Sequence, residues 1–276
     1  MTMQLAELLR GRRVAVLTGA GASTDSGIPD YRGPVSRLKP RDPIKLHRFV
    51  GDAAARARYW ARSTVGWPRF RAFRPNRVHE ALARLERAGH LGACITQNVD
   101  RLHRKAGHER VIELHGSLFE ARCLDCGAHE ARDALQARLL ALNPDAAGWT
   151  YALAPDGDVD IPDDVIGRFR VPPCAACGGL LKPDVVFFGE NVPPARVRAC
   201  YDEVDAAGAL LVVGSSLAVF SSYRFALRAR DRDLPIAIIN QGDTRADPFA
   251  TLRLDAPAAP TLEALERALS PGRRPG

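Results

Sequence analysis

The chain has 276 residues, of which 46% are hydrophobic and 26% charged, a balance typical of a globular protein rather than a disordered one. No apolar run approaches the roughly 20 residues of a membrane-spanning helix, and we find no secretory signal, so we expect a cytoplasmic protein. The net charge of +7 arises from 39 basic residues, which are mixed along the sequence with 32 acidic residues. It indicates either a solvated surface or a patch for anionic ligands, with no element specific for nucleic acid.

The first apolar run predicts a buried strand that leads into a glycine loop. Residues 13–18 are apolar and β-branched and end at Gly19, as expected for a strand of a parallel sheet. A helix is expected to begin within residues 22–27, with Ser23 as a candidate cap.

The stretch from about 35 to 75 is irregular and rich in Arg, Pro and aromatic residues, and we interpret it as a small helical lobe. Tyr59, Trp60 and Trp67 in this lobe either belong to its core or face a ligand.

The rest of the chain alternates between strand and helix patterns. Helices are expected at residues 77–88, 99–106, 195–207 and 261–269, and strands at 91–96, 111–114, 210–216 and 235–240 and from Leu180 onward. This alternation predicts an α/β fold with a doubly wound, Rossmann-like parallel sheet.

Four predicted strands end in small or amide residues. These ends are Gly19-Ala20-Gly21, Gln97-Asn98-Val99-Asp100, Gly214-Ser215-Ser216 and Asn240-Gln241-Gly242. Because parallel sheets bind ligands beyond the carboxyl ends of their strands, together they predict a nucleotide site. Taken singly, the first is equally a tight turn, since Thr24 breaks the G-x-G-x-x-G pattern, and Asn98 and Asp100 are equally helix caps.

Four of the six cysteines form two Cys-x-x-Cys pairs, Cys123 with Cys126 and Cys174 with Cys177. Two such pairs complete a tetrahedral zinc shell with no open position, which favours a structural metal over a redox pair.

His115 is the best placed of the seven histidines, because it follows a predicted strand and precedes a glycine. A neutral imidazole there acts either as a general base or as a hydrogen-bonded structural residue.

These residues resemble the sirtuins over roughly residues 13–260. The motifs that carry the resemblance are GAGASTDSGIPDYR (19–32), TQNVDRLH (96–103), ELHGS (113–117), KPDVVFFGE (182–190), GSSL (214–217) and IN-x-G (239–242). The cysteine pairs and the segment RYWARSTVGWPRF are most similar to class II sirtuins of the mitochondrial lipoamidase type.

The resemblance implies an NAD-dependent protein deacylase that moves an acyl group from lysine to ADP-ribose and releases nicotinamide. His115 matches the catalytic base, the four cysteines hold Zn, and Val186, Phe187, Phe188 and Gly189 bind the acyl-lysine substrate as an added strand. The implied NAD-binding residues are Gly19, Ala20, Gly21, Asp30, Tyr31, Arg32, Gln97, Asn98, Asp100, Gly214, Ser215, Ser216, Asn240 and Gly242.

The predicted organisation is a Rossmann-like domain of residues 1–117 and 182–276, with a zinc-binding insertion at 118–181 and a helical lobe at about 35–75. We expect a monomer with no membrane partner. Protein ADP-ribosylation from the same NAD site, and a non-catalytic NAD-binding module, are the alternatives.

The acyl group is inferred from one further comparison. The desuccinylating sirtuins bind an acyl carboxylate with a Tyr-x-x-Arg pair, and residues 34–44 of this chain contain Arg37 and Arg41 but no tyrosine. Neutral or long acyl groups, such as acetyl or lipoyl-like chains, are therefore expected.

Overall fold

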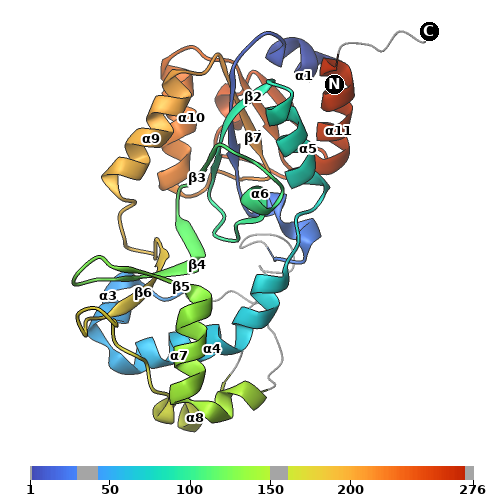
Figure 1. The fold of residues 1–276 in the computed structure, drawn as a ribbon. Coiled ribbons are helices and arrows are strands. Elements are labelled where there is room, and N and C mark those ends of the chain that lie inside the picture. Colours follow the sequence, from blue (N-terminus) through green and yellow to red (C-terminus); the bar gives the residue numbers. More distant parts are fainter. Residues whose placement is uncertain (1, 30–42, 150–160, 271–276) are drawn as a thin grey trace. The chain divides into compact units, whose positions relative to one another are not determined.

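The computed structural model describes residues 2–29, 43–149 and 161–270. Contacts group the chain into two units, which Figure 1 shows as ribbons. The first consists of Met1–Gly27, Arg74–Leu114 and Val192–Gly276, and the second of Ile28–Phe73 and His115–Asn191. Contacts thus place the region of the expected helical lobe with the cysteine-bearing segment, whereas the domain bounds inferred from the sequence remain a prediction.

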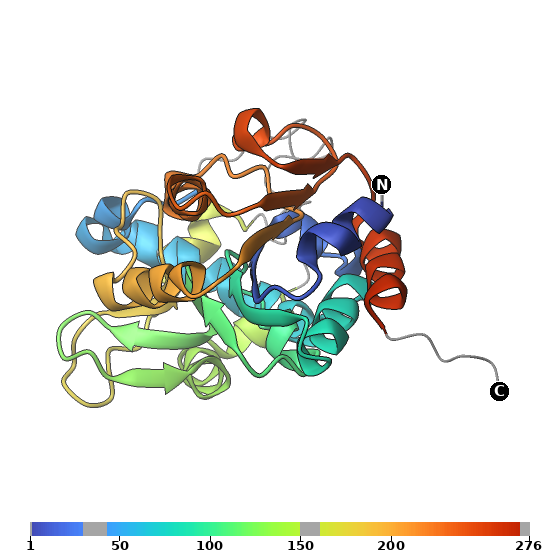
Figure 2. The same cartoon turned by 90° about the horizontal axis from the view of Figure 1, so that it is seen from above.

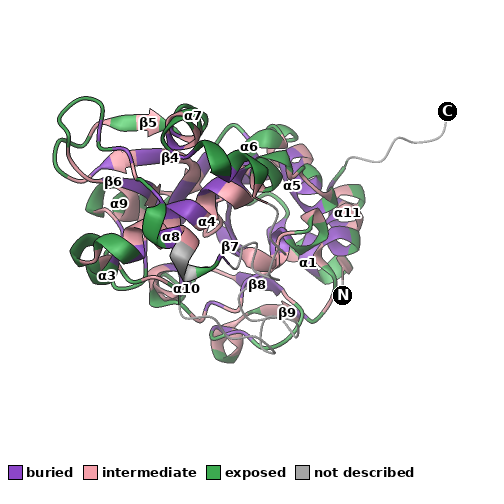
Figure 3. Cartoon of the chain, turned by 90° about the horizontal axis from the view of Figure 1, so that it is seen from below, coloured by how far each residue is buried: buried purple, intermediate pink, exposed green. Residues whose placement is uncertain are grey.

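A six-stranded parallel sheet forms the centre of the first unit. Its strands are β1 (Val14–Thr18), β2 (Leu91–Thr96), β3 (Val111–Glu113), β7 (Ala209–Val213), β8 (Ile236–Ile239) and β9 (Leu252–Leu254). They lie in the order β3-β2-β1-β7-β8-β9, and each paired neighbour is parallel. Strands β1, β2, β7 and β8 are buried along their whole length, as Figure 3 shows for β7 and β8, which explains their continuous apolar sequences.

Helices cover both faces of this sheet, which confirms the doubly wound fold. Helices α1 (Thr2–Leu9), α5 (Arg77–Arg87) and α11 (Ala258–Leu269) pack together on one face, and α9 (Pro194–Asp205) and α10 (Phe220–Asp231) on the other (Figures 1 and 2). Leu82 and Leu262 join Val16 and Leu211 in the main core cluster. The amphipathic faces of the helices therefore seal the strands from water.

The turns after β1 and β7 lie backbone against backbone, at the point where the strand order reverses. The Gly21 amide donates to the Gly214 carbonyl at 2.9 Å, and the Gly19 amide donates to the Val213 carbonyl at 3.2 Å. A Cβ on Gly19 would lie 2.7 Å from the Ser215 Cβ, and one on Gly21 would lie 2.9 Å from the Gly214 carbonyl oxygen. These glycines are required for the close approach of the two turns.

The second unit contains a three-stranded antiparallel sheet and a group of helices. The strands, in the order β5-β4-β6, are β4 (Gly116–Cys123), β5 (His129–Ala131) and β6 (Leu181–Val185). The helices are α3 (Leu46–Gly51), α4 (Ala53–Ala72), α7 (Arg132–Leu142) and α8 (Asp163–Arg168). Phe49, Trp60, Leu135, Leu139 and Phe187 are members of its buried core.

Trp60 of α4 belongs to this core, and Trp67 of the same helix is also buried, with 5% of the residue exposed, so neither ring faces an open ligand site. Their indole N–H groups donate to the Leu181 carbonyl at 3.3 Å and to Asp133 Oδ1 at 2.8 Å. The guanidinium of Arg132, only 1% exposed, lies 5.6 Å from the ring centre of Trp60 and 4.9 Å from that of Trp67. The two rings therefore enclose a buried cation.

Several elements differ from the sequence prediction. The helix expected from residues 22–27 is replaced by two single 3₁₀ turns, Ala20–Ala22 and Thr24–Ser26, and Ser23 forms no cap. The helix expected over 99–106 shortens to α6 (Leu102–Lys105). The close contact with the β7 turn and the left-handed backbone of Gly27, with φ of 86°, end the first segment too early for an α-helix.

The glycine contact can be tested with Gly214→Ala. Gly214 has φ of 60°, and a Cβ there would lie 2.5 Å from the Ala22 nitrogen, so we expect a loss of about 2 to 5 kcal/mol in the free energy of unfolding. Gly11→Ala is the matched control, because Gly11 has φ of 70° but nothing within 4 Å of the added Cβ. Its loss should be about 1 kcal/mol. Equal losses in chemical denaturation would contradict the contact.

Candidate functional site

The loops that follow β1, β2 and β7 are joined by side-chain hydrogen bonds. Gln97 Nε2 donates to Ser215 Oγ at 2.7 Å, and Asn98 Nδ2 donates to the Gly19 carbonyl at 2.9 Å. The Gln97 backbone amide also donates to the Thr18 carbonyl at 3.0 Å. Three of the four strand ends predicted from the sequence therefore form one hydrogen-bonded edge of the sheet, as a dinucleotide site requires.

Ser23 and Asp100 form the buried part of this edge. The Ser23 hydroxyl donates to Asp100 Oδ2 at 2.7 Å and lies 3.0 Å from Asn98 Nδ2. Asp100 Oδ1 accepts from the Leu102 amide at 2.9 Å and so satisfies the first amide of α6, although the N-cap position itself is Arg101. Burial raises the pKa of the Asp100 carboxyl, while the bonds from Leu102 and Ser23 favour its ionised form. The capping and site interpretations of Asp100 are thus both compatible with its contacts.

The other predicted cofactor residues lie on the β7 and β8 turns. The Ser216 carbonyl accepts from the Arg245 amide at 2.9 Å, and the Gly214 amide donates to the Ile239 carbonyl at 2.9 Å. Asn240 Nδ2 donates to the Gly242 carbonyl at 2.9 Å and so closes its own turn. The fourth loop is therefore preformed beside the third. Asp30, Tyr31, Arg32, Arg37 and Arg41 lie outside the described residues.

His115 begins the second segment of the second unit, His115–Asn191, and is half-buried. Its carbonyl accepts from the Val186 amide at 2.8 Å. The next residue, Gly116, has φ of 81°, and a Cβ there would lie 1.9 Å from the Asp184 carbonyl oxygen. The backbone that carries the imidazole is therefore held against the end of β6 by a glycine that no other residue can replace without movement.

The predicted substrate segment follows β6 and is held by a buried lysine. Lys182 Nζ pairs with Glu190 at 3.0 Å, donates to the Val185 carbonyl and lies 4.5 Å from the ring centre of Phe187. Glu190 Oε2 in turn accepts from the Phe187 amide at 2.9 Å. Burial lowers the pKa of Lys182 and its pairing with Glu190 opposes that shift. The contacts of Lys182 and Glu190 thus fix the shape of residues 186–189.

Phe188 of this segment is 49% exposed, unlike Phe187, which is buried among the rings of Phe49 and Tyr59. The Phe188 carbonyl accepts from the Leu46 amide at 3.0 Å. The Phe187 side chain thus faces the core and that of Phe188 the solvent, as for successive residues of an extended strand.

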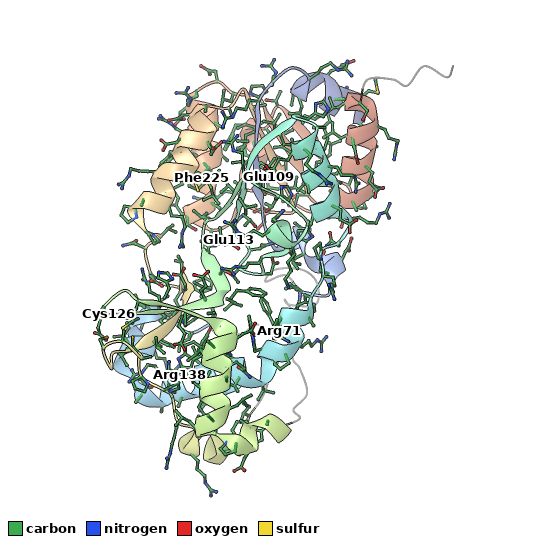
Figure 4. The ribbon with its side chains drawn as sticks, in the orientation of Figure 1. Arg71, Glu109, Glu113, Cys126, Arg138 and Phe225 are labelled. Carbon is green, nitrogen blue, oxygen red and sulfur yellow. The ribbon has the colours of Figure 1, made fainter. Side chains whose placement is uncertain are left out.

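The four cysteines lie together in two matching turns. Their Sγ atoms all lie within 4.8 Å of one another, with Cys123 and Cys177 at 3.5 Å and Cys126 and Cys174 at 3.8 Å. A tetrahedral Zn²⁺ with bonds of about 2.3 Å places its sulfurs roughly 3.8 Å apart, so the thiols fit this metal. Figure 4 labels Cys126 in the loop that follows β4.

Each cysteine pair is followed by a glycine that closes its turn. The Gly127 amide donates to the Cys123 carbonyl at 3.2 Å, and the Gly178 amide donates to the Cys174 carbonyl at 2.9 Å. Both glycines have positive φ, 74° and 76°. The backbone therefore presents the thiols with the same geometry on both sides of the site.

Three buried histidines of the first unit were missed by the sequence analysis. The ring centres of His79 and His103 are 4.8 Å apart, and those of His103 and His108 are 5.0 Å apart. His103 Nε2 lies 2.9 Å from Thr18 Oγ1, and His108 Nδ1 lies 2.8 Å from Glu86 Oε2. In the sequence, His79 stands among the apolar positions of α5 that include Leu82 and Leu85. Its place in that pattern was the available signal that this histidine is buried.

A Tyr-x-x-Arg spacing was also missed, because it lies outside residues 34–44. Tyr59 and Arg62 stand one turn apart on α4, and both are half-buried. The ring centre of Tyr59 is 5.4 Å from that of Phe187, next to the predicted substrate segment. This pair is therefore relevant to the nature of the acyl group.

Comparisons with known proteins agree with this geometry. The model of the "Sir2 family" matches residues 19–221. An NAD-dependent protein deacetylase of Xanthomonas axonopodis pv. citri is 51% identical over 92% of this chain and 86% of its own. The mitochondrial NAD-dependent protein lipoamidase sirtuin-4 of Bos taurus is 51% identical over 89% of this chain and 79% of its own.

A solved structure described as "Sir2-p53 peptide-NAD+" has a TM-score of 0.77 and 30% identity, and the match covers 97% of this chain and 98% of the other. In the described part of the chain, no helix combines the length and apolar character needed to cross a bilayer.

Removal of one thiol should remove the metal. We expect Cys126→Ser to lose bound zinc and to destabilise the second unit, because the free energy of zinc binding, about 10–16 kcal/mol in small zinc domains, is coupled to folding. Metal analysis and thermal unfolding of the purified proteins measure both effects. Cys200→Ser is the control, since Cys200 lies buried on α9 outside the cluster and should retain one zinc per chain. Equal zinc content in the two variants would contradict the site.

The buried histidines make stability depend on pH. Burial lowers the pKa of His103 and His108, and that of His79 to about 3, from the ordinary value of 6.5. Below pH 6.5 the unfolded chain therefore binds more protons than the folded one, and the free energy of unfolding falls by up to about 1.4 kcal/mol per pH unit for each histidine.

Denaturant titrations from about pH 8 to about pH 5 check this expectation. Stability should change little above about pH 7 and fall steeply below 6.5. A constant stability down to about pH 5 would show that the histidines are accessible to protons in the folded state.

Proposed function

The chain belongs to the Sir2 family, and we propose that it uses NAD to remove acyl groups from lysine side chains of proteins. In this reaction nicotinamide is released, the acyl group passes to ADP-ribose, one water is consumed and the lysine amine is freed. The observation that carries the proposal is the continuous family match over residues 19–221, which includes all three loops of the hydrogen-bonded sheet edge.

NAD supplies a ribose linkage whose leaving group is neutral nicotinamide. The protein therefore needs to bind NAD, to orient it toward the acyl-lysine and to exclude water. We assign the nicotinamide ribose and carboxamide to Gln97, Asn98 and Asp100, whose side chains are already ordered by Ser215, Gly19 and Ser23. The amides and small side chains of the first and third loops suit the phosphates.

The remaining predicted contacts follow the same pattern. Gly19, Ala20 and Gly21 with Ser215 and Ser216 are proposed for the phosphate side, and Asn240 with Gly242 for the adenosine side. The turn of Asn240 is closed by its own side chain, which supports a preformed rather than an induced pocket.

His115 is proposed as the general base that accepts a proton from a ribose hydroxyl. Support comes from its half-buried position, and from the Val186 and Gly116 contacts that hold its backbone. A base on a rigid element loses little freedom when the substrate arrives.

The protein substrate is proposed to pair with Val186–Gly189 as an added strand, with Zn²⁺ as a structural ion. The contacts of Lys182 and Glu190 order this segment in the absence of a peptide, which reduces the entropic cost of binding.

Two classes of acyl group are candidates for the substrate. The lipoamidase relative and the apolar surroundings of Phe187 favour the neutral or long acyl groups expected from the sequence. The Tyr59 and Arg62 pair favours an acyl chain that ends in a carboxylate. We retain the neutral or long class as the proposal and the acidic class as the second candidate.

The decisive experiment is nicotinamide release from NAD with a panel of acyl-lysine peptides. The panel contains acetyl-, lipoyl-, octanoyl- and succinyl-lysine, each on the same peptide. Lipoyl- or octanoyl-lysine as the best substrate agrees with the proposal, and succinyl-lysine would favour the acidic class. Radiolabel from NAD that stays on protein instead of leaving as acyl-ADP-ribose would favour ADP-ribosylation.

His115→Ala tests the assigned base. We expect kcat to fall by about 10²- to 10⁴-fold, as for removal of a general base, with an unchanged melting temperature. His129→Ala is the control, because His129 lies exposed on β5 and should leave turnover intact. Near-normal turnover by a well-folded His115→Ala protein would refute the role of His115.

A further inference from the structure

The N-terminus of α5 contacts the first cofactor loop through two side chains. Asn76, the N-cap, donates from Nδ2 to the Ala22 carbonyl at 2.9 Å. His79 Nε2, one turn into the helix, lies 3.3 Å from Ser23 Oγ. His79 and Ser23 are 0% and 1% exposed, so neither group has water as an alternative partner.

The contacts of the other ring nitrogen, Nδ1, assign the proton of His79. Two groups of Asn76 lie near His79 Nδ1: the backbone amide, which donates to it at 3.2 Å as part of the capping box, and Oδ1, at 3.1 Å. Because the backbone amide can only donate, and Asn76 Oδ1 already accepts from the Val78 amide at 2.8 Å, we assign Nδ1 as the acceptor and place the proton on Nε2. Burial lowers the pKa of His79 to about 3, and the neighbouring His108 contributes in the same direction. The ring is therefore neutral and donates its Nε2–H to Ser23 Oγ.

The Ser23 hydroxyl has one proton to donate, and its oxygen accepts two hydrogen bonds. His79 Nε2–H and Asn98 Nδ2, at 3.0 Å, both point their protons at Ser23 Oγ. The Ser23 proton must then point at Asp100 Oδ2, at 2.7 Å. Without the His79 donor, an acceptor site of Ser23 stays unsatisfied in a buried position, and the hydroxyl is free to rotate away from the carboxylate.

We propose that His79 is a positioning residue of the NAD site, which acts by orienting the Ser23 hydroxyl toward Asp100 and Asn98. The inference rests on the proposed function, since Asp100 and Asn98 are the side chains assigned there to the nicotinamide ribose and carboxamide. His79 itself does not touch the cofactor in this scheme. It makes the two site residues rigid before NAD arrives.

Two substitutions separate this role from the structural role of His79 in the helix cap. In His79→Asn the amide oxygen can accept from the Asn76 amide as Nδ1 does, but the side chain is too short to reach Ser23. In His79→Gln an amide N–H can take the place of Nε2–H. The proposal predicts that His79→Asn lowers kcat/KM for NAD by about 10- to 100-fold, whereas His79→Gln stays within about 3-fold of wild type.

A double-mutant cycle with Ser23→Ala tests the route of the effect. If His79 acts through Ser23, the loss caused by His79→Asn should largely vanish in the Ser23→Ala background. Equal losses in the Asn and Gln variants, a wild-type-like Asn variant, or losses that add in the double mutant would each overturn the proposal.

A measurement on the wild type is independent of folding of the variants and of turnover. Nitrogen-15 NMR of labelled histidine should show His79 as the neutral Nε2–H form at about pH 7. A proton on Nδ1 would overturn the proposal. A wild-type protein that binds NAD without releasing nicotinamide would refute the proposed function, while NAD affinity of the His79 variants, measured by calorimetry, would still test the role of His79.

Discussion

The first unit depends on the contact between two glycine turns. Gly19 and Gly21 allow the backbone after β1 to lie on the backbone after β7, and the Gly21 amide donates to the Gly214 carbonyl at 2.9 Å. Once the turns lie this close, the side chains of Gln97 and Asn98 reach across from β2. The site edge is thus a product of backbone sterics first and of side-chain chemistry second.

In the second unit, a different constraint holds the backbone near the proposed site. Here a metal-binding cluster and a glycine at the start of β4 hold the antiparallel sheet and the residue before it. Cys123 ends β4, whereas His115 immediately precedes it, so one strand connects the cysteine cluster to the proposed base. This arrangement links the integrity of the cysteine cluster to the position of the imidazole without any direct contact between them.

Much of the architecture could be predicted because it follows from periodicity and residue type. The buried strands β1, β2, β7 and β8 have continuous apolar sequences, and the cysteine spacing alone indicates a zinc site. The failures have physical reasons too. The sequence predicts Ser23 as a helix cap, because local sequence does not reveal that the carboxylate of Asp100, 77 residues away, accepts a hydrogen bond from its hydroxyl. His79, Lys182 and Arg132 are polar residues with buried partners, and their roles become visible only when the partners are placed.

The burial of Lys182 has a consequence for the chemistry of the protein itself. The chain has only four lysines, and this one keeps its amine against a carboxylate, a carbonyl and an aromatic ring, with 2% of the residue exposed. Reactive acyl thioesters modify amines that they can reach, and the amine of Lys182 is enclosed by its partners. The segment that Lys182 orders is therefore protected against the adventitious acylation that a deacylase would meet wherever its substrates form.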